Sequence, residues 1–224
     1  MLKRLLSLVE KICLKFWYYV GMDMQSLWRK RYLDLSYKWR DFVRYSSFEL
    51  VAQEIKEKGL LWDVAELGVF QWDSASKINE LFPDRTLYLF DTFEGFSSKD
   101  TDVEKQQKYS SGDQDFSLTS VDLVLKKMKY PNGCVIRKWY FPDTAIWIDT
   151  SFVFVSLDPD LYKPTYDGLC FFYPKLVKWG YIFIHDYNNS YYKWVRRAVH
   201  QFCTENNISF FPLSDNWWTA VIGK

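Results

Sequence analysis

The segment Val64–Phe96, VAELGVFQWDSASKINELFPDRTLYLFDTFEGF, decides the fold of this chain. Its pattern predicts a strand, a tight turn, a helix and a second strand. Glu66 and Gly68 lie at the end of the first strand, and Asp91 ends the second. A βαβ unit holds a nucleotide-like cofactor in this way, because glycine lets the backbone approach the ligand and the second carboxylate accepts two ribose hydroxyls. The N-terminus of the helix, where Ser74 is a further cofactor-binding candidate, offers free N–H groups.

Strands and helices alternate from residue 61 onward. This alternation predicts an α/β fold with an open, doubly wound, mostly parallel sheet at 46–224, preceded by a helical extension at 1–45. The strand FVFVSL at 152–157 is apolar on both faces, as a central strand covered by helices should be. The other strands are expected at 62–67, 86–90, 133–138, 180–184 and 219–223, and the helices near 74–82, 119–129, 165–177 and 192–206.

The sequence pattern is less informative for the N-terminal extension and for one long loop. Residues 2–20 have helical apolar spacing but are interrupted by charges, so they do not predict a transmembrane helix, and no signal-peptide cleavage site follows. This helix packs on the domain or a partner subunit, or it touches a membrane surface peripherally. Ser46 or Ser47 is a plausible N-cap for a helix with a buried stripe at Phe48, Leu50, Val51 and Ile55. The polar residues 97–118 predict a mobile loop that could act as a lid.

Composition excludes some classes of function. The net charge is +1, which gives no reason to propose a nucleic-acid partner. The four cysteines lie far apart and in no metal-ligand spacing, which favours reduced thiols in a cytoplasmic protein. The partner expected is therefore a small-molecule or glycan substrate, and a homo-oligomer is compatible with the sequence.

A second group of polar residues follows two adjacent strands. Asp158 and Asp160 come after the strand at 152–157, and His185 and Asp186 come after the strand at 180–184. The fold brings both pairs to the same sheet edge, where carboxylates and a histidine could hold a divalent cation that binds a substrate hydroxyl. A nearby carboxylate could accept the proton. The alternative is structural: an Asp at a strand end often caps the next turn, and a lone histidine in a sheet is often structural.

Several segments, in order, resemble the TylF/MycF-type macrocin O-methyltransferase family. They are VAELGVFQ, ELFPDRTLYLFDTFEGF, YFPDT, FVFVSLDPDLYKPTYDGLCFFYPKLV, YIFIHDYNN and VRRAV, and they cover about residues 42–224. Members are Rossmann-like class I enzymes that use S-adenosylmethionine and magnesium to methylate sugar hydroxyls.

The resemblance implies roles by position. It implies that Glu66, Gly68 and Asp91 bind the cofactor and that Tyr140 and Phe141 flank its adenine. It implies that Asp158 and Asp186 are metal ligands and that Asp160 is the general base. His185, which stands where antibiotic-tailoring members carry aspartate, is the third expected ligand of Mg²⁺ or a similar divalent cation.

The tryptophans form an anomaly, with 11 Trp against 9 Gly in the chain. Several of them stand where the family has glycine, a residue used for positive φ or close approach to a ligand. Two explanations compete: a degenerate relative whose cofactor pocket is plugged, or UGA codons that the cell reads as glycine and a different code reads as tryptophan. The tryptophans that stand at family glycine positions are Trp72, Trp139, Trp179, Trp194 and Trp218, and Trp62 and Trp147 look similar.

The leading hypothesis is a metal-dependent O-methyltransferase that transfers a methyl group from S-adenosylmethionine to a sugar hydroxyl of a glycosylated metabolite or surface polysaccharide. A non-catalytic binding or scaffold protein with a tryptophan-plugged pocket is the alternative. An NAD-dependent oxidoreductase is a weaker third, because the turn ELGVFQWD lacks the full G-x-G-x-x-G series.

Overall fold

The computed structural model describes residues 41–71, 73–109, 115–189, 193–215 and 219–224. The expected helix at 2–20 and its membrane contact lie outside these residues, as do Trp72 and Trp218. No helix among the described residues is both long enough and apolar enough to cross a bilayer.

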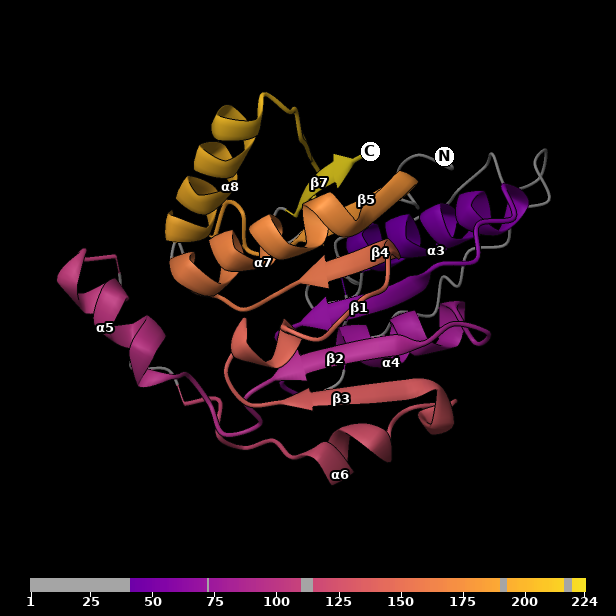
Figure 1. The fold of residues 1–224 in the computed structure, drawn as a ribbon, viewed down its shortest axis with the longest axis horizontal. Helices are drawn as coiled ribbons and strands as arrows, with labels where there is room; N and C mark the ends of the chain where they lie inside the picture. The colour runs from indigo at the N-terminus through magenta and orange to yellow at the C-terminus, as the bar shows by residue number, and fades with distance from the viewer. Residues whose placement is uncertain (1–40, 72, 110–114, 190–192, 216–218) are drawn as a thin grey trace, which may run out of the picture.

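The described strands form one seven-stranded sheet in the order β3-β2-β1-β4-β5-β7-β6 (Figure 1). β1 to β5 are parallel, whereas β7 runs antiparallel to β5 and to β6. The prediction of a doubly wound, mostly parallel α/β sheet is therefore confirmed. The strands are β1 (Asp63–Leu67), β2 (Leu87–Asp91), β3 (Cys134–Lys138), β4 (Phe152–Leu157), β5 (Leu176–Ile184), β6 (Phe211–Pro212) and β7 (Ala220–Gly223).

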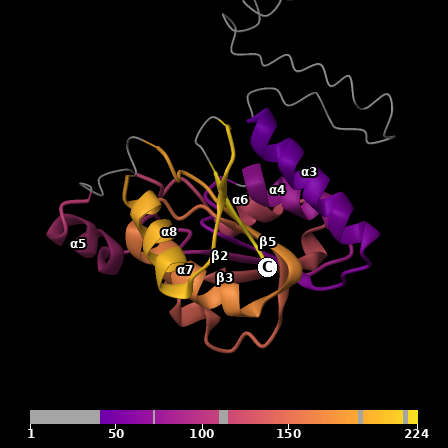
Figure 2. The same cartoon turned by 90° about the horizontal axis from the view of Figure 1, so that it is seen from above.

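Helices cover both faces of the sheet, with α3 and α4 on one side and α7 and α8 on the other (Figure 2). Because side chains alternate along a strand, β1 sends Val64 into the core under α3 and Ala65 and Leu67 into the core under α7. All six residues of β4 are buried, as its apolar sequence predicts. The helices are α3 (Phe42–Glu57), α4 (Asp73–Leu81), α5 (Ser98–Gln106), α6 (Val121–Leu125), α7 (Tyr162–Lys175) and α8 (Lys193–Asn206), with short 3-10 turns at Pro131–Gly133 and Asp143–Ala145.

The N-cap expected at Ser46 or Ser47 is wrong. α3 begins at Phe42, and the Asp41 side chain accepts hydrogen bonds from the backbone N–H groups of Val43 and Arg44. Ser46 and Ser47 lie inside the helix and donate to the carbonyl of Val43. The helix therefore crosses the boundary expected at residues 45 and 46. Of the expected buried stripe, Phe48 and Ile55 are buried, and Leu50 and Val51 are half-buried.

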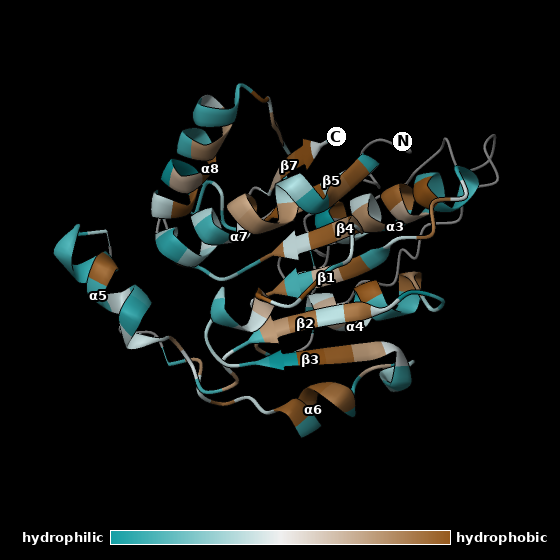
Figure 3. Ribbon diagram, in the orientation of Figure 1, coloured by the Kyte–Doolittle hydropathy of each residue, from teal (hydrophilic) through white to brown (hydrophobic). Residues whose placement is uncertain are grey.

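Other element boundaries also differ from expectation. The segment 97–118 contains α5, whose first turn is capped by Ser97. α5 is mostly hydrophilic and lies near the end of the sheet to which β1 to β4 point (Figure 3). α6 has only five residues, β5 begins at Leu176, and the two-residue β6 was not expected. These differences concern short or polar segments, where periodicity carries little information.

Candidate active site

A cavity of about 640 Å³ opens at the carboxyl ends of β1, β2, β3 and β4. Each of these strands contributes a residue to its wall: Gly68 after β1, Asp91 at the end of β2, Tyr140 after β3 and Asp158 after β4. In open α/β sheets, ligands bind in this crevice.

The turn after β1 is held by the carboxylate of Asp91. The Oδ2 atom accepts hydrogen bonds from the backbone N–H groups of Val69 (2.7 Å) and Phe70 (3.0 Å), and Oδ1 accepts from Phe93 N (2.6 Å). Gly68 has φ +84° and lies against the backbone of Asp158 and Pro159, directly after β4. A carboxylate has about four acceptor positions, so Asp91 fixes the turn and keeps capacity for a ligand hydroxyl.

The segment after β3 supplies the aromatic part of the wall. Tyr140 lines the cavity and donates a hydrogen bond to Asp100 on α5 (3.1 Å). Burial raises the pKa of Asp100 to about 6. Phe141 also borders the cavity, but it is 5% exposed and its ring stacks on Phe172 at 6.0 Å. Tyr140 therefore offers the more accessible ring.

Two of the cofactor-binding candidates lie outside the wall. Glu66 is one residue before Leu67 on β1, so its side chain lies on the α3 face, and it is not among the lining residues. Burial and then Asp158 raise the pKa of Glu66 well above its usual range. Ser74 is buried at the start of α4 and likewise does not line the cavity.

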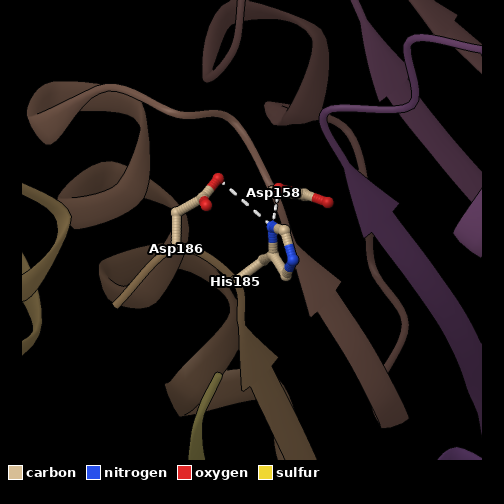
Figure 4. A group of neighbouring side chains, drawn as sticks. All are labelled: Asp158, His185 and Asp186. Atoms are coloured by element: carbon tan, nitrogen blue, oxygen red, sulfur yellow. Dashed lines mark hydrogen bonds and ion pairs between the residues drawn. The ribbon is translucent and has the colours of Figure 1, made fainter. Parts of the chain in front are cut away.

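Asp158, His185 and Asp186 form one cluster next to the cavity (Figure 4). One potential ligand atom from each residue lies within 4.8 Å of the others. His185 Nδ1 is 2.9 Å from Asp158 Oδ1 and 3.2 Å from Asp186 Oδ2. The structure thus brings together all three predicted metal ligands, and Asp158 belongs to both the cluster and the cavity wall.

The charge of Asp158 is balanced by two cationic partners. Arg44 on α3 is 4% exposed, and its Nη2 lies 3.2 Å from Asp158 Oδ2. Burial would raise the pKa of Asp158, but His185 and Arg44 outweigh it and lower this pKa to about 2. Burial and Arg44 would lower the pKa of His185, but Asp158 and Asp186 raise it to about 9.

Asp160 lies on the cavity wall with φ +60°. Burial, followed by the charges of Asp158 and Asp186, raises the pKa of Asp160 well above its usual range. Its backbone carbonyl accepts a hydrogen bond from the indole nitrogen of Trp194 (2.7 Å). Asp160 is thus held at the cavity as a carboxyl group with a raised proton affinity.

Comparison with known proteins decides the family. A profile of the macrocin O-methyltransferase (TylF) family matches residues 40–222, most of the chain. The chain belongs to the TylF family. Its members are S-adenosylmethionine-dependent O-methyltransferases, so the chain is one of these enzymes, and the resemblance noted in the sequence is confirmed. The match decides against the NAD-dependent oxidoreductase.

Solved structures agree with the TylF-family fold. The O-methyltransferase NovP superposes with a TM-score of 0.65 at 18% identity, over 82% of this chain and 80% of that one. The calicheamicin methyltransferase CalS11 gives 0.59 at 16% identity, over 81% of each chain. An O-methyltransferase from Bacillus cereus in complex with SAH gives 0.52 at 10% identity, over 80% and 81%. At these identities the likeness shows the fold. No curated protein matches the chain.

Membership of the TylF family suggests two bound groups, S-adenosylmethionine and a divalent cation. The residues present fit both. The cavity combines an aromatic side chain for adenine with carboxylates for ribose hydroxyls and an ammonium group. Trp139 lies on its wall, 59% exposed, and does not close it. The cluster offers two carboxylates and an imidazole, a donor set that suits a divalent cation.

Arg44, the buried cation of the site, was not predicted from the sequence. It lies in a stretch rich in charged and aromatic residues, where a solvated arginine and a buried one give the same pattern. Its role follows only from the packing of α3 against the sheet, which places the guanidinium between Ser156 and Asp158. No sequence signal that we recognise would have identified it.

We expect the stability of the metal-free protein to fall between pH 7 and pH 9. The pKa of His185 is raised to about 9 in the folded state, so its stabilising effect is complete below about 6.5 and is lost as the pH rises through 9. The full effect of His185 on the free energy of unfolding is about 3 kcal/mol, of which about 2 kcal/mol is lost between pH 7 and pH 9. Urea unfolding with chelator at several pH values measures it.

The His185→Asn variant is the control for this expectation. Its unfolding free energy should change less than that of the wild type between pH 7 and pH 9. Burial raises the pKa of the Cys134 and Cys203 thiols to about 11, so their contribution is common to both proteins. Equal pH dependence in the two proteins would contradict the assignment to His185.

Proposed function

We propose that this enzyme transfers the methyl group of S-adenosylmethionine to a sugar hydroxyl, with a divalent cation held by Asp158, His185 and Asp186. The observation that carries the proposal is the position of Asp158, which lines the cavity at the strand ends and also belongs to the cluster with His185 and Asp186. A methyl donor and a cation-bound acceptor would therefore lie side by side. Enzymes of this kind gain much of their rate from such alignment.

The cofactor is proposed to lie along the ends of β1, β2 and β3. S-adenosylmethionine supplies a methyl group on a sulfonium centre, which an oxygen nucleophile can displace. Gly68 lets the backbone approach this ligand, Asp91 accepts ribose hydroxyls, and Tyr140 and Phe141 border the adenine. Glu66 and Ser74 would support the turn from the α3 side, without direct contact with the ligand.

The cation would neutralise the cluster and lower the pKa of an acceptor hydroxyl. Carboxylates suit magnesium and manganese, whereas imidazole suits iron and zinc. We therefore propose Mg²⁺ or a similar divalent cation, for which Mn²⁺ can be substituted in experiments. His185 must release its proton before Nδ1 can be a ligand. The Asp158 carboxylate is already ionised and needs no such step.

Asp160 is proposed to accept the proton of the acceptor hydroxyl. It lies on the cavity wall close to Asp158 and Asp186, whose charges raise its proton affinity. A positive charge in the cluster would offset those carboxylates and let Asp160 ionise. The ionised Asp160 carboxylate would then be able to accept the proton of the acceptor hydroxyl.

The acceptor is proposed to be a sugar of a glycosylated metabolite or a surface polysaccharide. The family is named for macrocin O-methylation, and the similar structure of CalS11 is described as that of a TDP-rhamnose 3'-O-methyltransferase. Cys134, Cys170 and Cys203 are free thiols, which supports the proposed cytoplasmic location.

Transfer of labelled methyl from S-adenosylmethionine tests the proposal. The acceptors would be nucleoside-diphosphate sugars, glycosylated metabolites and cell-wall glycans, each with chelator, Mg²⁺ or Mn²⁺. We expect transfer to at least one sugar hydroxyl, loss with chelator and recovery with the metal. Asp160→Asn should lower kcat by about 10²-fold or more while S-adenosylhomocysteine still binds. Cofactor binding without transfer to any acceptor would favour the non-catalytic alternative.

A further inference from the structure

The described tryptophans lie where large apolar side chains are not expected. Four of the five are exposed: Trp62 (49%), Trp139 (59%), Trp147 (90%) and Trp179 (51%). Phe211, by contrast, is the only phenylalanine among the exposed large hydrophobic residues that the structure describes. Tryptophan is highly buried on average. The described phenylalanines are thus almost all at least partly buried, as expected, whereas most of the described tryptophans are exposed.

The backbone at position 139 adopts a conformation suited to glycine. Trp139 has φ +102°, whereas the other described non-glycine residues with positive φ lie between +41° and +66°. The small left-handed region open to L-residues covers about +50° to +70°. Gly68 at +84° and Gly95 at +90° are the residues closest to Trp139 in φ. A side chain with a Cβ is strained there.

The surroundings of Trp139 show why this conformation is imposed. Its N–H donates to the carbonyl of Asp91 (3.1 Å), directly after Lys138 has paired with Asp91 in the sheet. The chain must turn at this point to reach Tyr140 on the cavity wall. The indole ring contacts the flexible Lys138 side chain, with its ammonium 4.4 Å from the ring centroid.

Position 179 lies in an irregular part of β5. Phe152 and Phe154 of β4 pair with Leu176 and Tyr181, so extra residues on β5 bulge out between these pairs. Trp179 has φ +66° in this bulge, and its N–H donates to Lys224 O at 2.6 Å. A bulge residue with positive φ is most often glycine. The ammonium groups of Lys58 and Lys178 lie 4.9 and 5.7 Å from the centroid of its ring.

We propose that positions 139 and 179 are glycine in the protein made by its native cell. At these positions the gene would carry UGA codons, which that cell reads as glycine and a different genetic code reads as tryptophan. The composition agrees, because 9 Gly in 224 residues is below the usual share of about 7%. Glycine at 139 would relieve the strain of the turn and leave only backbone at this point of the cavity wall. Trp194, buried and hydrogen-bonded to Asp160, is not included. The proposal does not depend on the proposed function.

Peptide mass spectrometry of protein purified from the cells that carry the gene tests the proposal directly. Trypsin cleaves after Lys138 and after Lys178, so positions 139 and 179 begin separate peptides. The fragment ions of both peptides should show glycine as the first residue. Tryptophan at either position overturns the proposal, whatever the enzyme methylates.

Recombinant variants test the backbone argument without the native source. Trp139→Gly and Trp139→Ala both remove the indole, but only alanine keeps a Cβ at φ +102°. We expect the glycine variant to unfold at a temperature higher by about 3 °C or more. Trp147 is the matched control, because it is 90% exposed and has no positive φ. There alanine should equal or exceed glycine. An alanine variant at 139 at least as stable as the glycine variant would contradict the proposal.

Discussion

Replacing Asp158 by asparagine is expected to lower kcat/KM for methyl transfer by about 10²–10³-fold or more. Asp158 lines the cavity and lies in the cluster with His185 and Asp186. Asparagine keeps the size of the side chain but removes the charge that would hold the cation. The affinity for Mn²⁺, measured by a titration followed by electron paramagnetic resonance, should fall by at least about 100-fold.

Asp143→Asn is the matched control for this variant. Asp143 pairs with Lys99 at 3.2 Å, and both side chains are about 60% exposed. Loss of such a surface pair costs little. We expect wild-type turnover and metal affinity in the control. Unchanged Mn²⁺ binding in Asp158→Asn would rule out the metal assignment, and thermal unfolding would show whether the buried Arg44 tolerates a neutral partner.

Replacing Gly68 by alanine is expected to lower the free energy of unfolding by about 3–5 kcal/mol. A Cβ at this position would lie 2.2 Å from the Asp158 carbonyl oxygen and 2.9 Å from Pro159 N, both backbone atoms. The end of β1 would have to move away from β4, although the N–H of Asp158 donates to Leu67 O at 2.8 Å. Urea unfolding at neutral pH measures the loss.

Gly59→Ala is the control that separates the effect of the steric clash at Gly68 from the effect of a positive φ. Gly59 has φ +65°, and nothing lies within 4 Å of an added Cβ. This variant should lose only about 1–2 kcal/mol, the strain of the left-handed conformation. A similar loss in both variants would mean that contact with the backbone of Asp158 and Pro159 does not constrain Gly68. Binding of S-adenosylhomocysteine should fail in Gly68→Ala and persist in Gly59→Ala.

The fold and much of the site could be predicted from the chain because parallel strands end at one edge. That rule placed Gly68, Asp91 and Asp158 around one cavity from their positions in the sequence alone. The two-residue alternation along β1 sends Glu66 to the other face. Applied strictly, the same alternation would have separated Glu66 from the cavity before the structure was known.

The remaining features depend on contacts between segments distant in the sequence. Arg44 reaches Asp158 only because α3 packs under β4. Asp41 caps α3, although two serines five and six residues later also suit a cap, and helix propensity does not choose between such starts. The left-handed backbone at Trp139 follows from the pairing of β2 with β3.

A crystal structure with S-adenosylhomocysteine and Mn²⁺ tests the central claim most directly. The account predicts an anomalous peak for a manganese ion bound by Asp158, His185 and Asp186. S-adenosylhomocysteine should lie beside it, along Gly68, Asp91 and Tyr140. Manganese on other residues, or cofactor density away from the ends of β1 and β2, would contradict it.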